Sequence, residues 1–130
     1  MSSQSPIATV LLTLRLSVFL VMLMWTLDKI VNPAHAARVY ENFYAIGGLG
    51  RNAFLAIGAA ELVLLLAFVV GYRKRITYGA VLAFHAISTL SSYKQYLAPF
   101  EHLLFFAAWP MLAACFALYR LRHLDTKLTI

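Results

Sequence analysis

Two oppositely charged side chains lie inside apolar stretches of this chain, and they are its first candidates for chemistry. Arg15 interrupts the run PIATVLLTLRLSVFLVMLMWTL, and Glu61 interrupts the run NAFLAIGAAELVLLLAFVVG. A charge near the middle of a bilayer costs at least about 2.5–3.5 kcal/mol, so such residues usually pair or mark a functional site. The planar fork of a guanidinium matches a carboxylate. The sequence therefore predicts that Arg15 and Glu61 pair.

Three interpretations of these two residues are open at this stage. They could form a structural clasp between two helices, because breaking a buried ion pair typically costs about 3–5 kcal/mol. They could instead line a polar pocket or hold a proton-linked group inside a helical bundle. In the third interpretation, the apolar part of the Arg15 side chain lies in the membrane and its guanidinium reaches nearby lipid headgroups.

A second group of polar residues follows in the segment FHAISTLSSYKQY. Ser88, Thr89 and Ser92 come three, four and seven residues after His85, which places all four on one face of a helix. A neutral imidazole can both donate and accept a hydrogen bond. This face could hold a quinone carbonyl or a lipid head oxygen, or it could bond a neighbouring helix. The candidate ligand-binding residues are thus Arg15, Glu61, His85, Ser88 and Ser92.

Four further polar residues fall at the predicted ends of apolar stretches, on the side opposite the basic segment GYRKR. These residues are Asp28, Lys29, Glu101 and His102. Together they could form a mouth for a ligand or a docking face for a partner. Alternatively, they are ordinary charges at helix ends.

Other kinds of site have little support in the sequence. His85 and His102 differ in predicted depth by about six residues, or roughly 10 Å of helical rise, and this mismatch argues against a haem held between them. No spacing of His and carboxylate residues suits a metal ion. The lone Cys115 excludes an internal disulfide. We expect no catalytic residues and no resident cofactor, although a quinone or lipid could bind.

The composition indicates the elements that must position these residues. Of the 130 residues, 62% are hydrophobic and 12% are charged, against about 45–50% and about 25% in soluble domains. Apolar stretches at about 8–30, 52–71, 76–94 and 99–119 are each near the length that crosses a bilayer. Backbone groups in lipid must be paired internally, so these stretches should be helices. We predict an all-α integral membrane protein, one domain over 1–130, with a four-transmembrane-helix bundle.

The first loop and the basic residues complete this prediction. The segment AARVYENFY has an apolar side that suits a short interfacial helix. Basic residues are more frequent in the 71–75 link and the C-terminal tail than on the opposite side, which predicts that both termini are cytoplasmic. The net charge is +6, but the basic residues lie at the ends of the predicted helices. Membrane topology explains this placement, so the charge does not indicate nucleic-acid binding.

Several short motifs resemble the DoxX-like membrane proteins, a superfamily with DoxD and MauE branches. They are an Arg early in the first span, DKIVNP at its end, and GAAELVLLLAFVVGYRKR in the second span. The matching positions are Arg15, Lys29, Pro33, Glu61 and Gly71. The resemblance implies a four-span fold and a role as a partner subunit of a quinone-linked system or as an assembly factor. The chain lacks the cysteine pair of the MauE branch, so we expect no thiol chemistry.

These observations lead to three functional hypotheses. The first is a non-catalytic accessory subunit of an inner-membrane complex linked to quinone or electron transfer, associated with other subunits or with itself. The second is a quinone- or lipid-binding enzyme or carrier with an Arg15–Glu61–His85 pocket. The third is a membrane-protein assembly factor.

Overall fold

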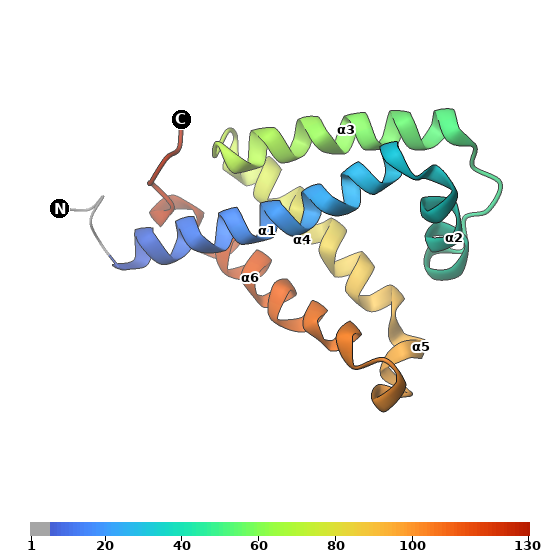
Figure 1. Ribbon diagram of the computed structural model, residues 1–130. Helices are drawn as coiled ribbons and strands as arrows, with labels where there is room; N and C mark the ends of the chain where they lie inside the picture. The colour runs from blue at the N-terminus through green and yellow to red at the C-terminus, as the bar shows by residue number, and fades with distance from the viewer. Residues whose placement is uncertain (1–5) are drawn as a thin grey trace.

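The computed structural model describes residues 6–130, and within them every regular element is a helix. Figure 1 shows their arrangement. In chain order they are α1 (Pro6–Val31), α2 (Pro33–Tyr44), α3 (Arg51–Val69), α4 (Lys74–Ser91), α5 (Tyr93–Tyr96), η2 (Pro99–Glu101), η3 (Leu103–Ala107), α6 (Ala108–Arg120) and η4 (Arg122–Leu124).

Three helical stretches are long and apolar enough to cross a membrane, among the residues that the structure describes. They are α1, α3 and the continuous stretch Leu103–Arg120 formed by η3 and α6. The predicted helices at 8–30 and 52–71 are thus confirmed as helices of that character. α4 covers most of the predicted stretch 76–94, but its basic start and its polar His85–Ser91 face make it less apolar than the other three.

The predicted span at 99–119 is confirmed over Leu103–Arg120 but not at 99–102, and its first part is not α-helical. In place of a continuous α-helix, η2 and η3 are short 3-10 segments, and α6 begins only at Ala108. Pro99 and Pro110 lack the backbone N–H that an α-helix needs from its interior residues. Pro110 therefore lies in the first turn of α6, where no such donor is required.

The helices form two pairs that meet at one end and diverge at the other. α1 packs chiefly on α3, and α4 packs chiefly on α6. Figure 1 shows the α4–α6 pair leaving the α1–α3 pair as it runs toward α5. The buried core lies where the pairs meet and draws two residues from each helix: Leu11, Val18, Leu65, Phe68, Tyr78, Val81, Cys115 and Leu118. We call this the closed end, and the opposite end, which carries α2 and α5, the open end.

α2 confirms the short helix predicted in the first loop. Asn32 ends α1, and Pro33 occupies the first position of α2, where its fixed φ angle favours helix initiation. Ala45 then ends α2 in the left-handed region at φ 56°. The helix lies across the open end, and its Val39 and Phe43 face the space between the two helix pairs.

Candidate functional site

Arg15 is fully buried at the closed end, where it binds the C-terminal segment 125–130. Its Nη1 pairs with the carboxylate of Asp125, which is also fully buried. Nε donates to the carbonyl of Val69 at 3.0 Å, and Nη2 donates to that of Lys127 at 2.6 Å. One side chain therefore joins α1, the end of α3 and the tail.

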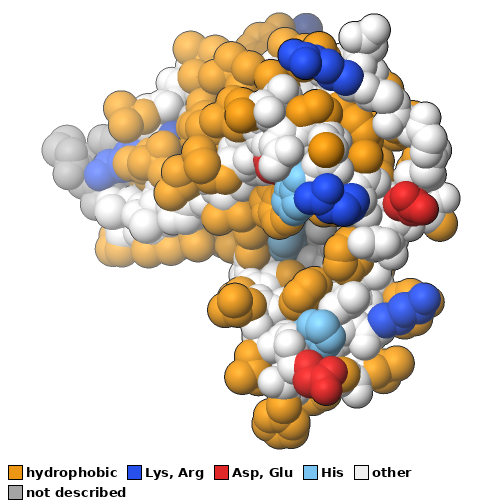
Figure 2. Space-filling model, turned by 45° about the vertical axis from the view of Figure 1, so that its right-hand side comes forward, with side chains coloured by type: hydrophobic (Ala, Val, Ile, Leu, Met, Phe, Trp, Pro, Cys, Tyr) orange, Lys and Arg blue, Asp and Glu red, His pale blue; other side chains and the backbone are white. Residues whose placement is uncertain are grey.

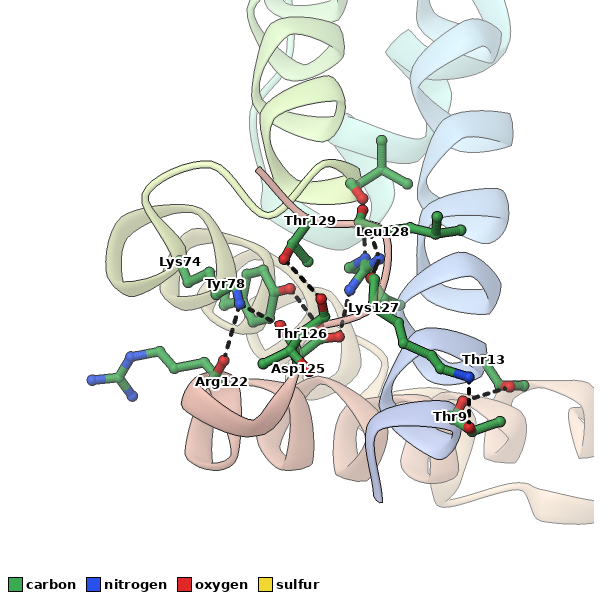
Figure 3. Close-up of polar contacts among 12 residues, drawn as sticks. Thr9, Thr13, Lys74, Tyr78, Arg122, Asp125, Thr126, Lys127, Leu128 and Thr129 are labelled. Atoms are coloured by element: carbon green, nitrogen blue, oxygen red, sulfur yellow. Dashed lines mark hydrogen bonds and ion pairs between the residues drawn. The ribbon is translucent and has the colours of Figure 1, made fainter. Parts of the chain in front are cut away.

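The Asp125 carboxylate has a second partner, and the tail is held at further points. Figure 3 shows Tyr78 and Lys74 directed at Asp125. The Tyr78 hydroxyl donates to the carboxylate, and Lys74 Nζ donates to the Asp125 carbonyl. The Ile130 N–H donates to the Val70 carbonyl at 2.9 Å. The tail thus covers the closed end.

The predicted pairing of Arg15 with Glu61 is wrong. Arg15 lies level with Val69 at the very end of α3, whereas Glu61 lies eight residues earlier, about 12 Å away along the helix. The offset arises because α1 has 26 residues and α3 has 19, so the start of α1 extends past the end of α3. Arg15 still forms a buried ion pair, but with Asp125. Its complete burial also rules out the interpretation in which it reaches lipid headgroups.

Glu61 belongs to a different polar cluster, nearer the open end. Its Oε1 accepts hydrogen bonds from Lys29 Nζ at 3.0 Å and from Thr26 Oγ1 at 3.2 Å. Lys29 Nζ also lies 5.8 Å from the centre of the Tyr40 ring, within the range of a cation–π contact. Four side chains from α1, α2 and α3 therefore meet at one point.

This cluster lies on the wall of a large cleft between the two helix pairs. The cleft has a volume of about 1120 Å³, and its walls are mainly apolar. Figure 2 shows a hollow on the face toward the open end, with His and Lys or Arg side chains beside it. The polar residues that line the cleft are Ser17, Thr26, Asp28, Lys29, Tyr40, Tyr44, Glu61, His85, Ser88, Ser91 and Ser92.

The polar residues predicted to share one face of this helix lie on the wall of the cleft, with one exception. His85, Ser88 and Ser92 line it, whereas the Thr89 hydroxyl is buried and donates to the His85 carbonyl at 2.8 Å. His85 Nε2 lies 3.0 Å from the Ala108 carbonyl. A carbonyl only accepts, so Nε2 must carry the proton, and in a neutral imidazole Nδ1 is then an acceptor. The same residue thus bonds a neighbouring helix and faces the cleft.

The four residues of the predicted mouth fall into two groups. Asp28 and Lys29 line the cleft, whereas Glu101 and His102 are not among its lining residues. Asp28 pairs instead with His35, whose Nδ1 lies 2.6 Å from its carboxylate. The His102 ring packs on the edge of Phe105, with the ring centres 5.4 Å apart. The mouth as predicted does not form.

Sequence reasoning missed several residues of both sites. In the cleft these are Thr26, Tyr40 and Ser91, and at the closed end they are Tyr78 and Asp125. Asp125 carries a visible signal, because it is the only acidic residue after Glu101. Thr26 also carries one, because it precedes Lys29 by three residues and so shares its helical face.

Tyr40 makes the stability of the protein depend on pH at the alkaline end. Burial, the Glu61 carboxylate and Tyr44 together raise the pKa of Tyr40 from 10.0 to about 12. The folded state therefore favours the neutral phenol, and this contribution is complete below pH 10 and is lost as the pH rises from 10 to 12. We expect the melting temperature of Tyr40→Phe to fall less over this window than that of the parent protein. Parallel melting curves of the two proteins across the window would contradict this assignment.

No protein-family model matches the chain, and no curated protein and no solved structure matches it. The function must therefore be argued from the geometry of the site alone.

Proposed function

We propose that the protein is a four-span membrane protein that binds an amphiphilic molecule, a quinone or a lipid, in the cleft between its helix pairs. The observation that supports this most strongly is the form of the cleft. It is closed at one end by the core and the tail, and its mainly apolar walls carry a polar cluster near the open end. Such a cleft fits a molecule with an apolar chain and a polar head.

The size of the cleft supports a lipid-like occupant. Small-molecule sites typically enclose about 300–1,000 Å³ and combine apolar walls with a few placed polar groups. At about 1120 Å³, the cleft lies just above that range. An acyl or prenyl chain would lie against Val18, Leu65 and Met111, which line its deeper part.

α4 is the fourth span in this proposal. Its 18 residues equal the length of the stretch Leu103–Arg120 on which it packs, and at 1.5 Å per residue they cover about 27 Å. Its polar residues His85, Ser88 and Ser91 line the cleft, while Ile76 and Leu90 are exposed on its surface. An amphiphile in the cleft would complete the apolar surroundings that such a helix requires.

The basic residues give the proposed orientation. Arg73, Lys74 and Arg75 lie at the closed end beside the basic tail. Under the positive-inside rule this end faces the cytoplasm, with both termini, and the membrane is the cell inner membrane. The polar cluster then lies toward the outer leaflet.

Blocking the cleft should reduce retention of the ligand. We expect Ser88→Trp to lower the amount of co-purifying quinone or lipid by about tenfold, equivalent to about 1.4 kcal/mol, because the indole occupies the cleft. The amount is measured by native mass spectrometry and lipid extraction after purification in a mild detergent. Ala83→Trp is the matched control, because Ala83 is exposed on the same helix and is not a lining residue. Equal retention in both variants would refute the proposed function.

A second candidate is an accessory subunit or assembly factor, as the resemblance to the DoxX-like superfamily implies. The observation in its favour is the apolar tip around η2 and η3, where Leu97, Phe100 and Leu104 are 81%, 89% and 90% exposed. A partner seated on this tip would cover them. The same purification tests this candidate, because a subunit retains its partner in fixed stoichiometry and an assembly factor does so only transiently.

A further inference from the structure

The charges on the cleft wall bear on which amphiphile it accepts. The charged lining residues are Asp28, Lys29 and Glu61, and no arginine is among them. These three residues carry one positive and two negative charges. Asp28 is paired with His35, which lies outside the lining of this cleft.

Lys29 is the only cation among the described residues that line the cleft, and it already has partners. Lys29 Nζ lies 3.0 Å from Glu61 Oε1 and faces the Tyr40 ring, and its side chain is only 12% exposed. An anionic head would have to displace Glu61 or lie beside two carboxylates without a free cation. Like charges brought together in a poorly solvated site are strongly unfavourable, so the wall discriminates against anions.

Two acceptor atoms of the wall lack a protein donor among the described residues. Both hydrogen bonds to Glu61 end on Oε1, so in the described part of the chain Oε2 accepts none. In a neutral imidazole, His85 Nδ1 is likewise an acceptor, because the bond to Ala108 uses Nε2, and none of residues 6–130 donates to it. Acceptors of this kind need hydrogen-bond donors from the ligand, which a carbonyl group cannot supply.

We infer that the cleft selects an uncharged lipid whose head carries free hydroxyl groups, in the manner of a diacylglycerol. Its hydroxyls donate to Glu61 Oε2 and His85 Nδ1, and its acyl chains lie along the apolar walls. This inference rests on the proposed function and narrows the class of ligand. It excludes anionic phospholipids because of their negative charge, and it excludes oxidised quinones because they have no hydrogen-bond donor.

The test compares three lipids that differ in charge or in hydrogen-bond donors, bound to the purified protein in mild detergent and counted by native mass spectrometry. Diacylglycerol is neutral and donates. Phosphatidylglycerol donates but is anionic, and oxidised ubiquinone is neutral but cannot donate. We expect diacylglycerol to bind about tenfold more tightly than either of the others, the factor typical of one or two lost hydrogen bonds.

A pair of variants tests the charge argument directly. Glu61→Gln releases the Lys29 cation and should raise the affinity for phosphatidylglycerol about tenfold. The double variant Lys29→Met/Glu61→Gln has no cation at this point and should lose that gain. Melting temperatures close to that of the parent protein show that both variants are folded.

The outcomes separate the inference from the proposal on which it rests. If the parent protein binds phosphatidylglycerol or oxidised ubiquinone as tightly as diacylglycerol, or if Glu61→Gln shows no gain, the inference is overturned while the binding function stands. If none of the three lipids binds in a manner sensitive to Ser88→Trp, the proposed function itself fails.

Discussion

Arg15→Met is expected to lower the free energy of unfolding by about 3–5 kcal/mol, the largest effect of any single substitution considered. The substitution leaves the Asp125 carboxylate fully buried without its ion-pair partner, and breaking a buried ion pair by removing one partner is strongly destabilising. It also removes the hydrogen bonds to the carbonyls of Val69, Lys127 and Leu128. The measurement is unfolding in mixed micelles with increasing denaturing detergent.

Two further variants make this prediction specific. Arg75→Met removes an exposed cation from the same end of the molecule and should change stability by less than about 0.5 kcal/mol. The double variant Arg15→Met/Asp125→Leu replaces both charges with apolar groups and should recover much of the loss, because neither charge is left unpaired. A loss in Arg15→Met no larger than that in Arg75→Met would contradict the role given to this pair.

Gly58→Val is expected to destabilise the protein by about 1–3 kcal/mol, the usual range for overpacking. A Cβ at Gly58 would lie 2.6 Å from Ile30 Cγ1 and 3.1 Å from its Cδ1, with the Thr26 carbonyl at 3.5 Å. α1 and α3 would have to separate at the level of the Thr26–Glu61 hydrogen bond. The substitution should therefore reduce both the melting temperature and ligand retention.

The neighbouring position supplies the control for this substitution. Ala59 is exposed on the same helix, so Ala59→Val adds β-branching without entering the contact between α1 and α3. We expect its melting temperature to stay within a few degrees of the parent value. If Gly58→Val and Ala59→Val unfold at the same temperature, close packing at Gly58 does not hold the two helices together.

The features that the sequence predicted correctly are those that depend on local spacing. His85, Ser88 and Ser92 share a face because helical periodicity fixes it, whatever the rest of the chain does. The helices themselves follow from long apolar runs that are broken by Pro33 and Gly71.

The partners of the charged residues could not be predicted, because they depend on how far one helix slides along another. An offset of about eight residues along α3 separates Arg15 from Glu61, which pairs instead with Lys29. The true partner of Arg15 lies in a polar tail beyond the apolar runs, where periodicity carries no information. The divergence of the two helix pairs could not be predicted either, because it depends on a buried core that occupies only the closed end.

The ion pair at the closed end also constrains how the protein is made. Arg15 and Asp125 are separated by 110 positions in the chain. At about 5–20 residues per second, a ribosome needs roughly 5–20 s to travel that distance. Throughout this interval α1 carries a cation whose carboxylate has not yet been synthesised. The ion pair at the closed end can therefore form only after translation has passed residue 125.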